Sequence, residues 1–409
     1  ERGMLIHKKK RLLVLKPRCP EHITATIPTA KAFQYKGATL VAVPHKIDEV
    51  RVLRNMGIKA PSPILHYYDW PRNKYTVPNP FFAQTETAAF FTYHQRSYCN
   101  SGLGSGKTLS LLWTYDYLRS IGERKRLLVV STLSTLDRAW GDTIFEHFPH
   151  LTFSVLHGSK DKRLKLLNQL VDIYIINHDG LKVIGDAFAE RPDVDIVAVD
   201  EVSEAARNAQ TDRWKSLNEV VNKQPVRMKL PPRYCIGLTA TPVPNDPTDA
   251  WAQCRLITPD TVPPYYNRFK DMVMRLSGPY NWLPREGAME IVHKVMQPAI
   301  RFSREECVDL PPTTYMTREV PLTPEQEKAY KSMQAKLKAE VDAGEVLAVN
   351  EAVKIMKLAQ ICVGSVLDVN GEEVTINCKP RLDEALSLVR ESQTKTIVFV
   401  PFISSLNMV

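Results

Sequence analysis

The sequence lacks the features that mark membrane and secreted proteins. It contains no run of eighteen or more apolar residues, which is about the length that a membrane-spanning helix needs. Its first residues do not follow the charged, apolar and small-residue order of a secretion signal. We therefore expect an intracellular protein that makes no contact with a membrane.

Cysteine is sparse, and its spacing is irregular. The seven cysteines form no C-x-x-C pair, and an odd number in a chain of 409 residues argues against a disulfide framework or a zinc site. Internal repeats and long low-complexity tracts are also missing from the sequence. What is present is ordinary for a globular protein, with 44% apolar and 24% charged residues. The length predicts two or three domains.

The chain has a formal net charge of +9, which two interpretations can explain. One is a polyanionic partner, and the other is a solvated surface with an excess of lysine. The basic run Lys8 to Arg11 has the same ambiguity, because such a run can contact nucleic acid, serve as a nuclear address or form a flexible arm.

The first part of the chain, residues 1–78, reads as an accessory α+β domain. Apolar and β-branched residues predict strands at Leu12–Leu15 and Ala38–Val43, and helical spacing predicts a helix at Ile47–Met56. The proline-rich stretch Pro61–Pro80 is typical of a connection.

Residues 79–256 change to short apolar strands that alternate with amphipathic helices. Continuous apolar strands of this kind are buried on both faces of a parallel sheet, which predicts an α/β layered domain. The strands are expected at Leu127–Val130, Ile173–Asn177, Ile196–Val199 and Ile236–Thr239.

Two further segments complete the predicted organisation. Residues 257–310 are rich in proline, methionine and aromatics, and we expect a helical insertion or linker there. A new α/β pattern occupies residues 311–409, with a helix at Pro324–Val341 and a strand at Thr396–Val400.

A glycine-rich segment, Ser101 to Thr108 (S-G-L-G-S-G-K-T), follows a short apolar run and precedes a helical pattern. Such glycines let backbone N–H groups surround phosphate oxygens, and the following helix adds its positive end. Lys107 would then bridge the β- and γ-phosphates, and Thr108 would ligate Mg²⁺. Ser101 stands where the strict pattern has glycine, and the alternative is an ordinary glycine-rich turn. The predicted nucleotide-binding residues here are Gly102, Gly104, Ser105, Gly106, Lys107 and Thr108.

Two more groups of polar residues follow apolar strands. Asp200 and Glu201 end one strand, where one carboxylate can hold Mg²⁺ and its neighbour can act as general base on water. Thr239 and Thr241 end another, where two hydroxyls can link the acidic pair to groups across the cleft. The alternative for the acidic pair is a charged strand end with no catalytic role. The alternative for the two threonines is a simple exit from a strand into a turn. The catalytic residues expected are Lys107, Asp200 and Glu201.

These three elements, in this order, resemble superfamily 2 helicases and translocases, and most of all the small Swi/Snf-type ATPases encoded by bacteriophages. The resemblance covers residues 79–409 and implies a RecA-like lobe, a P-loop NTPase fold, at residues 79–256. A second lobe would begin at residue 311. The implied cofactors are ATP and Mg²⁺, and Phe82 and Gln84 match the motif that reads adenine.

The resemblance extends to the nucleic-acid contacts of the first lobe. The segment Ser131–Trp140 is similar to motif Ia without its usual proline, and Ile176–Asp179 lies where motif Ib would be. Val202 and Ser203 follow the acidic pair where the family often has a small residue and then histidine. A basic–Asn pair expected shortly afterwards is matched by Arg207–Asn208. The implied nucleic-acid contacts are Ser131, Thr132, Asn177 and His178.

The second lobe is similar to the family at four short segments. These are Leu310–Pro312, Val320–Gln326, Gln360–Cys362 and Lys379–Val400, and Thr323 is also a helix N-cap. Counterparts of motifs V and VI, with their arginine finger, do not follow before Val409. Because the sequence also begins at Glu1, we expect a truncated chain that is poorly active alone and comes from a longer motor.

The resemblance implies an ATP-dependent DNA translocase or helicase that acts on duplex or forked DNA, in the cytoplasm of a bacterium or a phage-infected host. Two alternatives remain open, a nucleic-acid-binding regulatory module without turnover and an RNA helicase. The N-terminal domain could grip DNA, dock a protein partner or support the first lobe.

Overall fold

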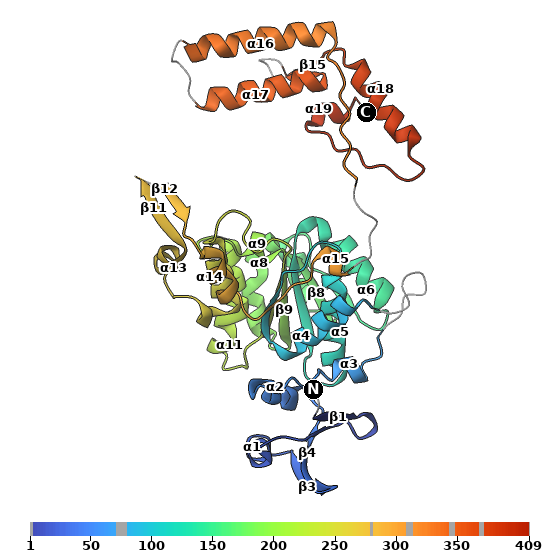
Figure 1. The fold of residues 1–409 in the computed structure, drawn as a ribbon, viewed down its shortest axis with the longest axis vertical. Helices are drawn as coiled ribbons and strands as arrows, with labels where there is room; N and C mark the ends of the chain where they lie inside the picture. The colour runs from blue at the N-terminus through green and yellow to red at the C-terminus, as the bar shows by residue number, and fades with distance from the viewer. Residues whose placement is uncertain are drawn as a thin grey trace. The chain divides into compact units, whose positions relative to one another are not determined.

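The computed structural model describes residues 3–70, 80–278, 281–307, 314–342, 348–367 and 372–408. Residues 1–310 form one compact unit and residues 311–409 a second (Figure 1). Within the described residues, no helix is both long enough and apolar enough to cross a bilayer. The finer division of residues 1–310 into three domains stays a prediction.

The chain begins with a four-stranded antiparallel sheet in the order β1-β2-β4-β3. Alternate residues such as Leu13, Val41 and Val43 are buried beneath α1 and α2. The strands and helix predicted in this region are confirmed. The bounds are β1 (Met4–His7), β2 (Leu12–Leu15), α1 (Pro20–Thr26), β3 (Lys31–Tyr35), β4 (Ala38–Pro44) and α2 (Ile47–Asn55).

A second, seven-stranded sheet forms the centre of the first unit, in the order β13-β5-β10-β9-β6-β8-β7. Every pairing in it is parallel. This confirms the α/β fold and the four predicted strands. The bounds are β5 (Arg96–Cys99), β6 (Arg126–Ser131), β7 (Phe153–Val155), β8 (Ile173–Asn177), β9 (Val194–Asp200), β10 (Tyr234–Leu238) and β13 (Ala299–Ile300).

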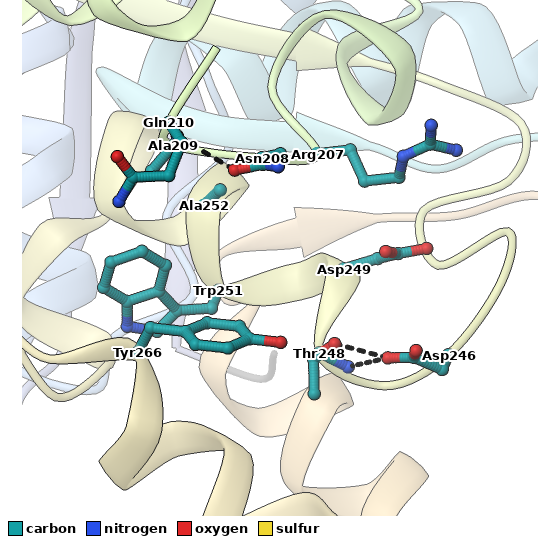
Figure 2. A pocket seen from close by; sticks show the side chains of 10 residues that line it. All are labelled: Arg207, Asn208, Ala209, Gln210, Asp246, Thr248, Asp249, Trp251, Ala252 and Tyr266. Atoms are coloured by element: carbon teal, nitrogen blue, oxygen red, sulfur yellow. Dashed lines mark hydrogen bonds between the residues drawn. The ribbon is translucent and has the colours of Figure 1, made fainter. Parts of the chain in front are cut away.

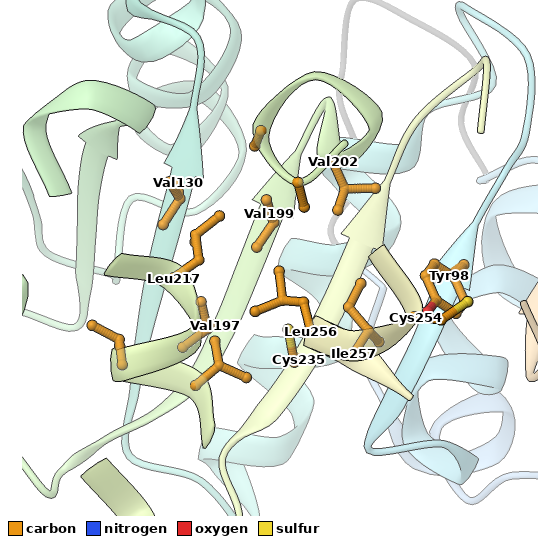
Figure 3. Close-up of a cluster of buried hydrophobic side chains, with 14 of the residues drawn as sticks. Tyr98, Val130, Val197, Val199, Val202, Leu217, Cys235, Cys254, Leu256 and Ile257 are labelled. Carbon is orange, nitrogen blue, oxygen red and sulfur yellow. The ribbon is translucent and has the colours of Figure 1, made fainter. Parts of the chain in front are cut away.

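Helices cover both faces of this sheet, which explains why its strands are apolar throughout. In β6, Leu127 and Val129 join one core cluster, and Leu128 and Val130 join the other, part of which is drawn in Figure 3. The helices that follow the N-terminal sheet are α3 (Ile64–Tyr67), α4 (Phe82–Tyr93), α5 (Lys107–Ser120), α6 (Asp142–His147), α7 (Lys160–Leu167), α8 (His178–Ile184), α9 (Val202–Ala205), α10 (Asp212–Asn218), α11 (Gln224–Arg227) and α12 (Asp249–Ile257).

The segment predicted as a helical insertion, residues 257–310, is only partly helical. It contains α13 (Tyr266–Val273), α14 (Ala288–Val295) and α15 (Arg304–Cys307), but also an antiparallel pair, β11 (Met274–Gly278) with β12 (Asn281–Pro284). Its strand β13 then pairs with β5 and forms one edge of the main sheet. The sequence did not reveal β13 because two residues are too short to show a periodicity.

The second unit contains a helical pair and a two-stranded antiparallel sheet, β14-β15. The predicted helix at Pro324 is confirmed, and Thr323 caps it. The predicted strand at Thr396–Val400 is wrong, because these residues pair with no strand in the described part of the chain, and Phe399 is 91% exposed. A second RecA-like lobe stays a prediction, and Leu310–Pro312 lies outside the described residues. The bounds are α16 (Pro324–Asp342), α17 (Ala348–Val363), β14 (Ser365–Leu367), β15 (Glu373–Thr375), α18 (Lys379–Glu391) and α19 (Ile403–Leu406).

Candidate functional site

The register of the parallel sheet brings the predicted site segments to one edge. Leu238 at the end of β10 pairs with Cys99 on one side and with Asp200 on the other. Ser131 at the end of β6 pairs with Asn177 at the end of β8. The segments that follow these strands therefore leave the sheet at its carboxyl edge, which is where ligands bind in open α/β sheets.

The glycine-rich loop connects β5 to α5 and has the backbone of an anion-binding loop. Gly104 and Gly106 have φ values of +77° and +78°, in the left-handed region that favours glycine. A Cβ atom on Gly106 would also lie 2.0 Å from Nε2 of Gln84. The loop leads into a 14-residue helix whose N-terminus is positive. The Nζ of Lys107 donates to the carbonyls of Ser101 and Gly102, at 2.9 and 3.1 Å.

Gln84 and Phe82, the predicted adenine-reading residues, lie at the start of α4 beside this loop. Gln84 is only 6% exposed, and its Oε1 accepts a hydrogen bond from the backbone N–H of Phe81 at 3.0 Å. Phe82 is 73% exposed, and its ring meets Phe302 edge-to-face with centroids 6.4 Å apart. The two side chains thus contribute differently, because Gln84 supports Gly106 and Phe82 presents an aromatic face to solvent.

Phe302 also holds the loop through its backbone, which the sequence did not predict. Its carbonyl accepts from the N–H of Gly102 at 3.1 Å, and its N–H donates to Oγ of Ser101 at 3.0 Å. The serine that replaces the expected glycine therefore anchors the loop to the segment after β13. Phe302 is about 200 residues from the loop and belongs to no motif, so no local signal pointed to it.

Asp200 has a carboxylate that three donors hold in place. Its Oδ2 accepts from Oγ of Ser131 at 2.8 Å and from Nε1 of Trp140 at 3.0 Å. Its Oδ1 accepts from the backbone N–H of Glu201 at 3.1 Å. Ser131 and Trp140 are both fully buried. Trp140 lies in a π-helical turn, Leu136–Gly141, and its role was not predicted.

Glu201 has a left-handed backbone, with φ of +48°, and a half-buried side chain. Burial raises the pKa of its carboxyl, and the negative charge of Asp200 raises it further, while Lys107 opposes both effects. Oγ1 of Thr239 donates to Oε2 of Glu201 at 3.4 Å and lies 2.9 Å from Oγ of Ser203. Thr239 therefore joins the threonine turn both to Glu201 and to Ser203, and Ser203 stands at the place where the family resemblance leads one to expect histidine.

The four predicted nucleic-acid contacts are placed differently from one another. Ser131 and His178 are buried, and Nε2 of His178 lies 2.9 Å from the carbonyl oxygen of Asp200. Burial is the largest of the effects that lower the pKa of His178. Both side chains thus face Asp200, which differs from the predicted contact with a phosphate backbone. Asn177 accepts from Nη1 of Arg163 at 3.2 Å, and Thr132 is half-buried beside Thr135.

Comparison with known proteins identifies the family to which this chain belongs. The model of the SNF2-related domain family matches residues 99–373, which is more than half of the chain. The chain belongs to this family. It is 22% identical over 312 residues to "Putative protein p41" of Acyrthosiphon pisum secondary endosymbiont phage 1, an alignment that covers 73% of this chain and 66% of that protein.

Two solved structures of the Sulfolobus solfataricus SWI2/SNF2 ATPase core are also similar to this SNF2-related chain. The core in complex with dsDNA gives a TM-score of 0.46 and the core domain alone gives 0.44, each at 22% identity over 78% of this chain. This chain covers 65% of the length of the first structure and 68% of the length of the second. The chain thus spans about two thirds of the length of the relatives it matches.

A pocket of about 470 Å³ lies among segments that follow β9 and β10 of this SNF2-related chain (Figure 2). The predicted basic–Asn pair, Arg207 and Asn208, lines it. Trp251 and Tyr266 form its aromatic side, with ring centroids 5.6 Å apart. The pair thus lines a pocket distinct from the phosphate loop.

The residues of this SNF2-related chain fit a magnesium nucleotide. The loop offers glycines in left-handed conformations and a helix N-terminus, which suit phosphate oxygens. Thr108 lies in the first turn of α5, and Asp200 is already oriented by its three donors. Magnesium in such sites is bound by one or two carboxylates together with the phosphates, so one fixed carboxylate and one hydroxyl are a sufficient protein contribution.

Proposed function

We propose that this SNF2-related chain carries the ATP-hydrolysing site of a motor that moves along or remodels DNA. The observation that supports the proposal most is the convergence of four residues at one edge of the sheet. Lys107, Asp200, Glu201 and Thr239 come from three different strand ends, and hydrogen bonds join the last three of them.

The loop residues Gly102 to Thr108 would hold the phosphates of ATP, with Lys107 against the β- and γ-phosphates. Thr108 and Asp200 would hold Mg²⁺, which when bound offsets the negative charge of the phosphates. Phe82 would lie against the adenine ring, because its exposed face adjoins the loop through Phe302. Gln84 would support Gly106 and read the edge of the adenine.

Glu201 is proposed as the general base that takes a proton from the attacking water. A carboxylate whose pKa is raised binds a proton more tightly than an ordinary one, so burial and Asp200 make Glu201 a better proton acceptor. Thr239 donates to one of its oxygens and thereby orients the other. Through Ser203, Thr239 and Thr241, a change at Glu201 would reach the turn after β10, which is the proposed coupling path.

The proposed partner is DNA, duplex or forked. Membership of the SNF2-related family supports this, together with the net positive charge of +9. Contact with the phosphate backbone is proposed for Thr132 and Asn177, since Ser131 and His178 face inward.

The test is ATP hydrolysis by the longest natural form of the protein that contains this sequence. It should be measured alone and with duplex, forked and single-stranded DNA and with RNA. We expect stimulation by DNA, and we expect Lys107→Ala and Glu201→Gln each to lower the stimulated rate by roughly a hundredfold or more. Glu204→Gln is the matched control, because it removes an exposed carboxylate three residues away. A rate that no nucleic acid changes would contradict the motor. Salt-sensitive DNA binding without turnover would favour the regulatory module.

A further inference from the structure

The positive charge of the chain is concentrated in its first sixty residues. Residues 1–60 contain thirteen lysines and arginines against four aspartates and glutamates, so they carry +9. The remaining residues contain 41 of each sign and are neutral overall. The charge excess of the whole chain therefore belongs to the four-stranded sheet and its two helices, and residues 61–409 taken together contribute none of it.

This sheet has one buried face and one open face. Residues of the buried face, such as Leu13 and Val41, pack beneath α1 and α2. The strand register places their neighbours on the other face, where Leu5 pairs with Val14 and Phe33 pairs with Leu40. The open face is the set Leu5, Leu12, Val14, Lys31, Phe33, Tyr35, Leu40 and Ala42, and each of these residues is partly or largely exposed.

The edge strand β3 presents two aromatic rings on this open face. Phe33 and Tyr35 are 40% and 54% exposed, and because they are two residues apart they lie on the same side of the strand, about 7 Å from each other. The strand begins with Lys31 on the same face and is followed by Lys36, whose Nζ lies 5.4 Å from the centroid of the Tyr35 ring.

Further cations stand at the end of the sheet where β1 turns into β2. Lys8, Lys9 and Lys10 form an exposed turn there, and Arg11 lies over the ring of Tyr67 at 5.0 Å. An extended polyanion that crosses the open face would thus meet positive charge at both ends of the sheet and aromatic rings between them.

We propose that the open face of the N-terminal sheet binds single-stranded DNA. Aromatic rings on an exposed sheet, flanked by lysines, are the arrangement that stacks unpaired bases while neutralising phosphates. In a duplex the bases are already stacked and their faces cannot reach Phe33 or Tyr35. The site is separate from the nucleotide site, so the proposal does not depend on ATP hydrolysis and its failure would leave the proposed function intact.

The test is fluorescence anisotropy of a labelled oligothymidylate of about twenty nucleotides, long enough for one such site. The full chain is used, without ATP. We expect the double variant Phe33→Ala/Tyr35→Ala to raise the Kd at least about tenfold, since each aromatic–base stack contributes substantially. We expect Lys31→Gln/Lys36→Gln to reduce the slope of log Kd against log salt by about 1.4, for two phosphates released.

Three controls separate this site from general effects. Tyr35→Phe keeps the ring and should retain the wild-type Kd. Lys107→Ala should also leave the Kd unchanged, because it alters only the nucleotide site. The variant Leu170→Ala/Val226→Ala removes two apolar side chains that lie elsewhere in the first unit and are 77% and 80% exposed. It should leave the Kd unchanged. An unchanged Kd in Phe33→Ala/Tyr35→Ala would overturn the proposal. So would a rise in the Kd for duplex DNA or RNA, in this variant, as large as the rise for oligothymidylate.

Discussion

At the scale of single residues, the folded chain disfavours the charged form of the Glu201 carboxyl. Burial and the neighbouring Asp200 raise the pKa of its carboxyl, so the folded chain binds this proton more tightly than the unfolded chain does. The loss of stability therefore begins as the pH rises above about 4.3, the ordinary value for Glu, and is complete above the raised pKa. A charged Glu201 thus lowers the stability at neutral pH.

Glu201→Gln is consequently expected to raise the thermal unfolding temperature at pH 7.5, and the gain should shrink as the pH approaches 4. Thermal unfolding of both proteins by circular dichroism across this range measures it. Glu204→Gln, an exposed carboxylate that pairs with Arg213 at 3.4 Å, should show no such gain. A Glu201→Gln variant that is less stable than wild type at pH 7.5 would mean that the negative charge is compensated in the folded chain.

The sequence predicted the site residues that lie in local patterns, and it missed those that meet across the sheet. The glycine-rich loop and the acidic pair are each a contiguous segment, so local sequence was enough to predict them, and their role in binding a nucleotide stays a prediction. Trp140 donates to Asp200 from 60 residues away, and Phe302 holds the loop from about 200 residues away. The sequence also did not predict where the side chains of Ser131 and His178 point. Their positions at the ends of strands were clear, but both side chains point inward to Asp200, and this depends on how the neighbouring strands are arranged.

At the scale of elements, α16 begins with a reciprocal cap. Oγ1 of Thr323 accepts from the N–H of Gln326 at 3.2 Å, and Oε1 of Gln326 accepts from the N–H of Thr323 at 3.1 Å. Oγ1 of Thr323 also donates to the carbonyl of Asn377 at 2.7 Å, so the cap joins α16 to the segment after β15.

Thr323→Ala removes both functions of this hydroxyl, and the loss of a cap typically costs about 1 kcal/mol. We expect the amides of the first turn of α16 to exchange with solvent roughly fivefold faster, as measured by hydrogen exchange with mass spectrometry. Thr396→Ala, at an exposed position outside any helix or strand, is the matched control. Equal exchange in Thr323→Ala and wild type would show that the cap does not limit opening.

Prediction of elements succeeded where burial imposes a pattern over several residues. The central strands β6, β8, β9 and β10 are apolar because helices cover both faces, and this pattern is visible in the sequence. The run Thr396–Val400 has the same apolar character, yet it pairs with no described strand and only Val400 is partly buried, because a strand forms only where a partner supplies hydrogen bonds. Composition alone does not say whether that partner is there.

At the scale of the whole molecule, the basic N-terminal sheet is fixed to the part of the first unit that contains the seven-stranded sheet, through α2 and α4. The guanidinium of Arg51 donates to the carbonyl of Thr92 at 2.8 Å, and that of Arg54 lies over the ring of Tyr93 at 3.9 Å. His94 stands at the end of α4 beside these two cations, with its ring 4.6 Å from that of Phe90. Burial, and then Arg54 and Arg51, lower the pKa of His94 to about 4.

This junction should make the chain sensitive to mild acid. The unfolded chain takes up a proton at His94 below about pH 6.5 and the folded chain does so only near 4, so stability is full above 6.5 and is lost as the pH falls between these values. His45, His66 and His178 also have lowered pKa values and contribute in the same direction. We therefore expect His94→Gln to reduce, but not abolish, the fall in unfolding free energy between pH 7 and 5, measured by urea titration.

The control for this prediction is His157→Gln, at an exposed site, which should leave that fall unchanged. Identical pH profiles for wild type and His94→Gln would show that protonation of His94 does not oppose folding, and that the two arginines tolerate a third positive charge beside them.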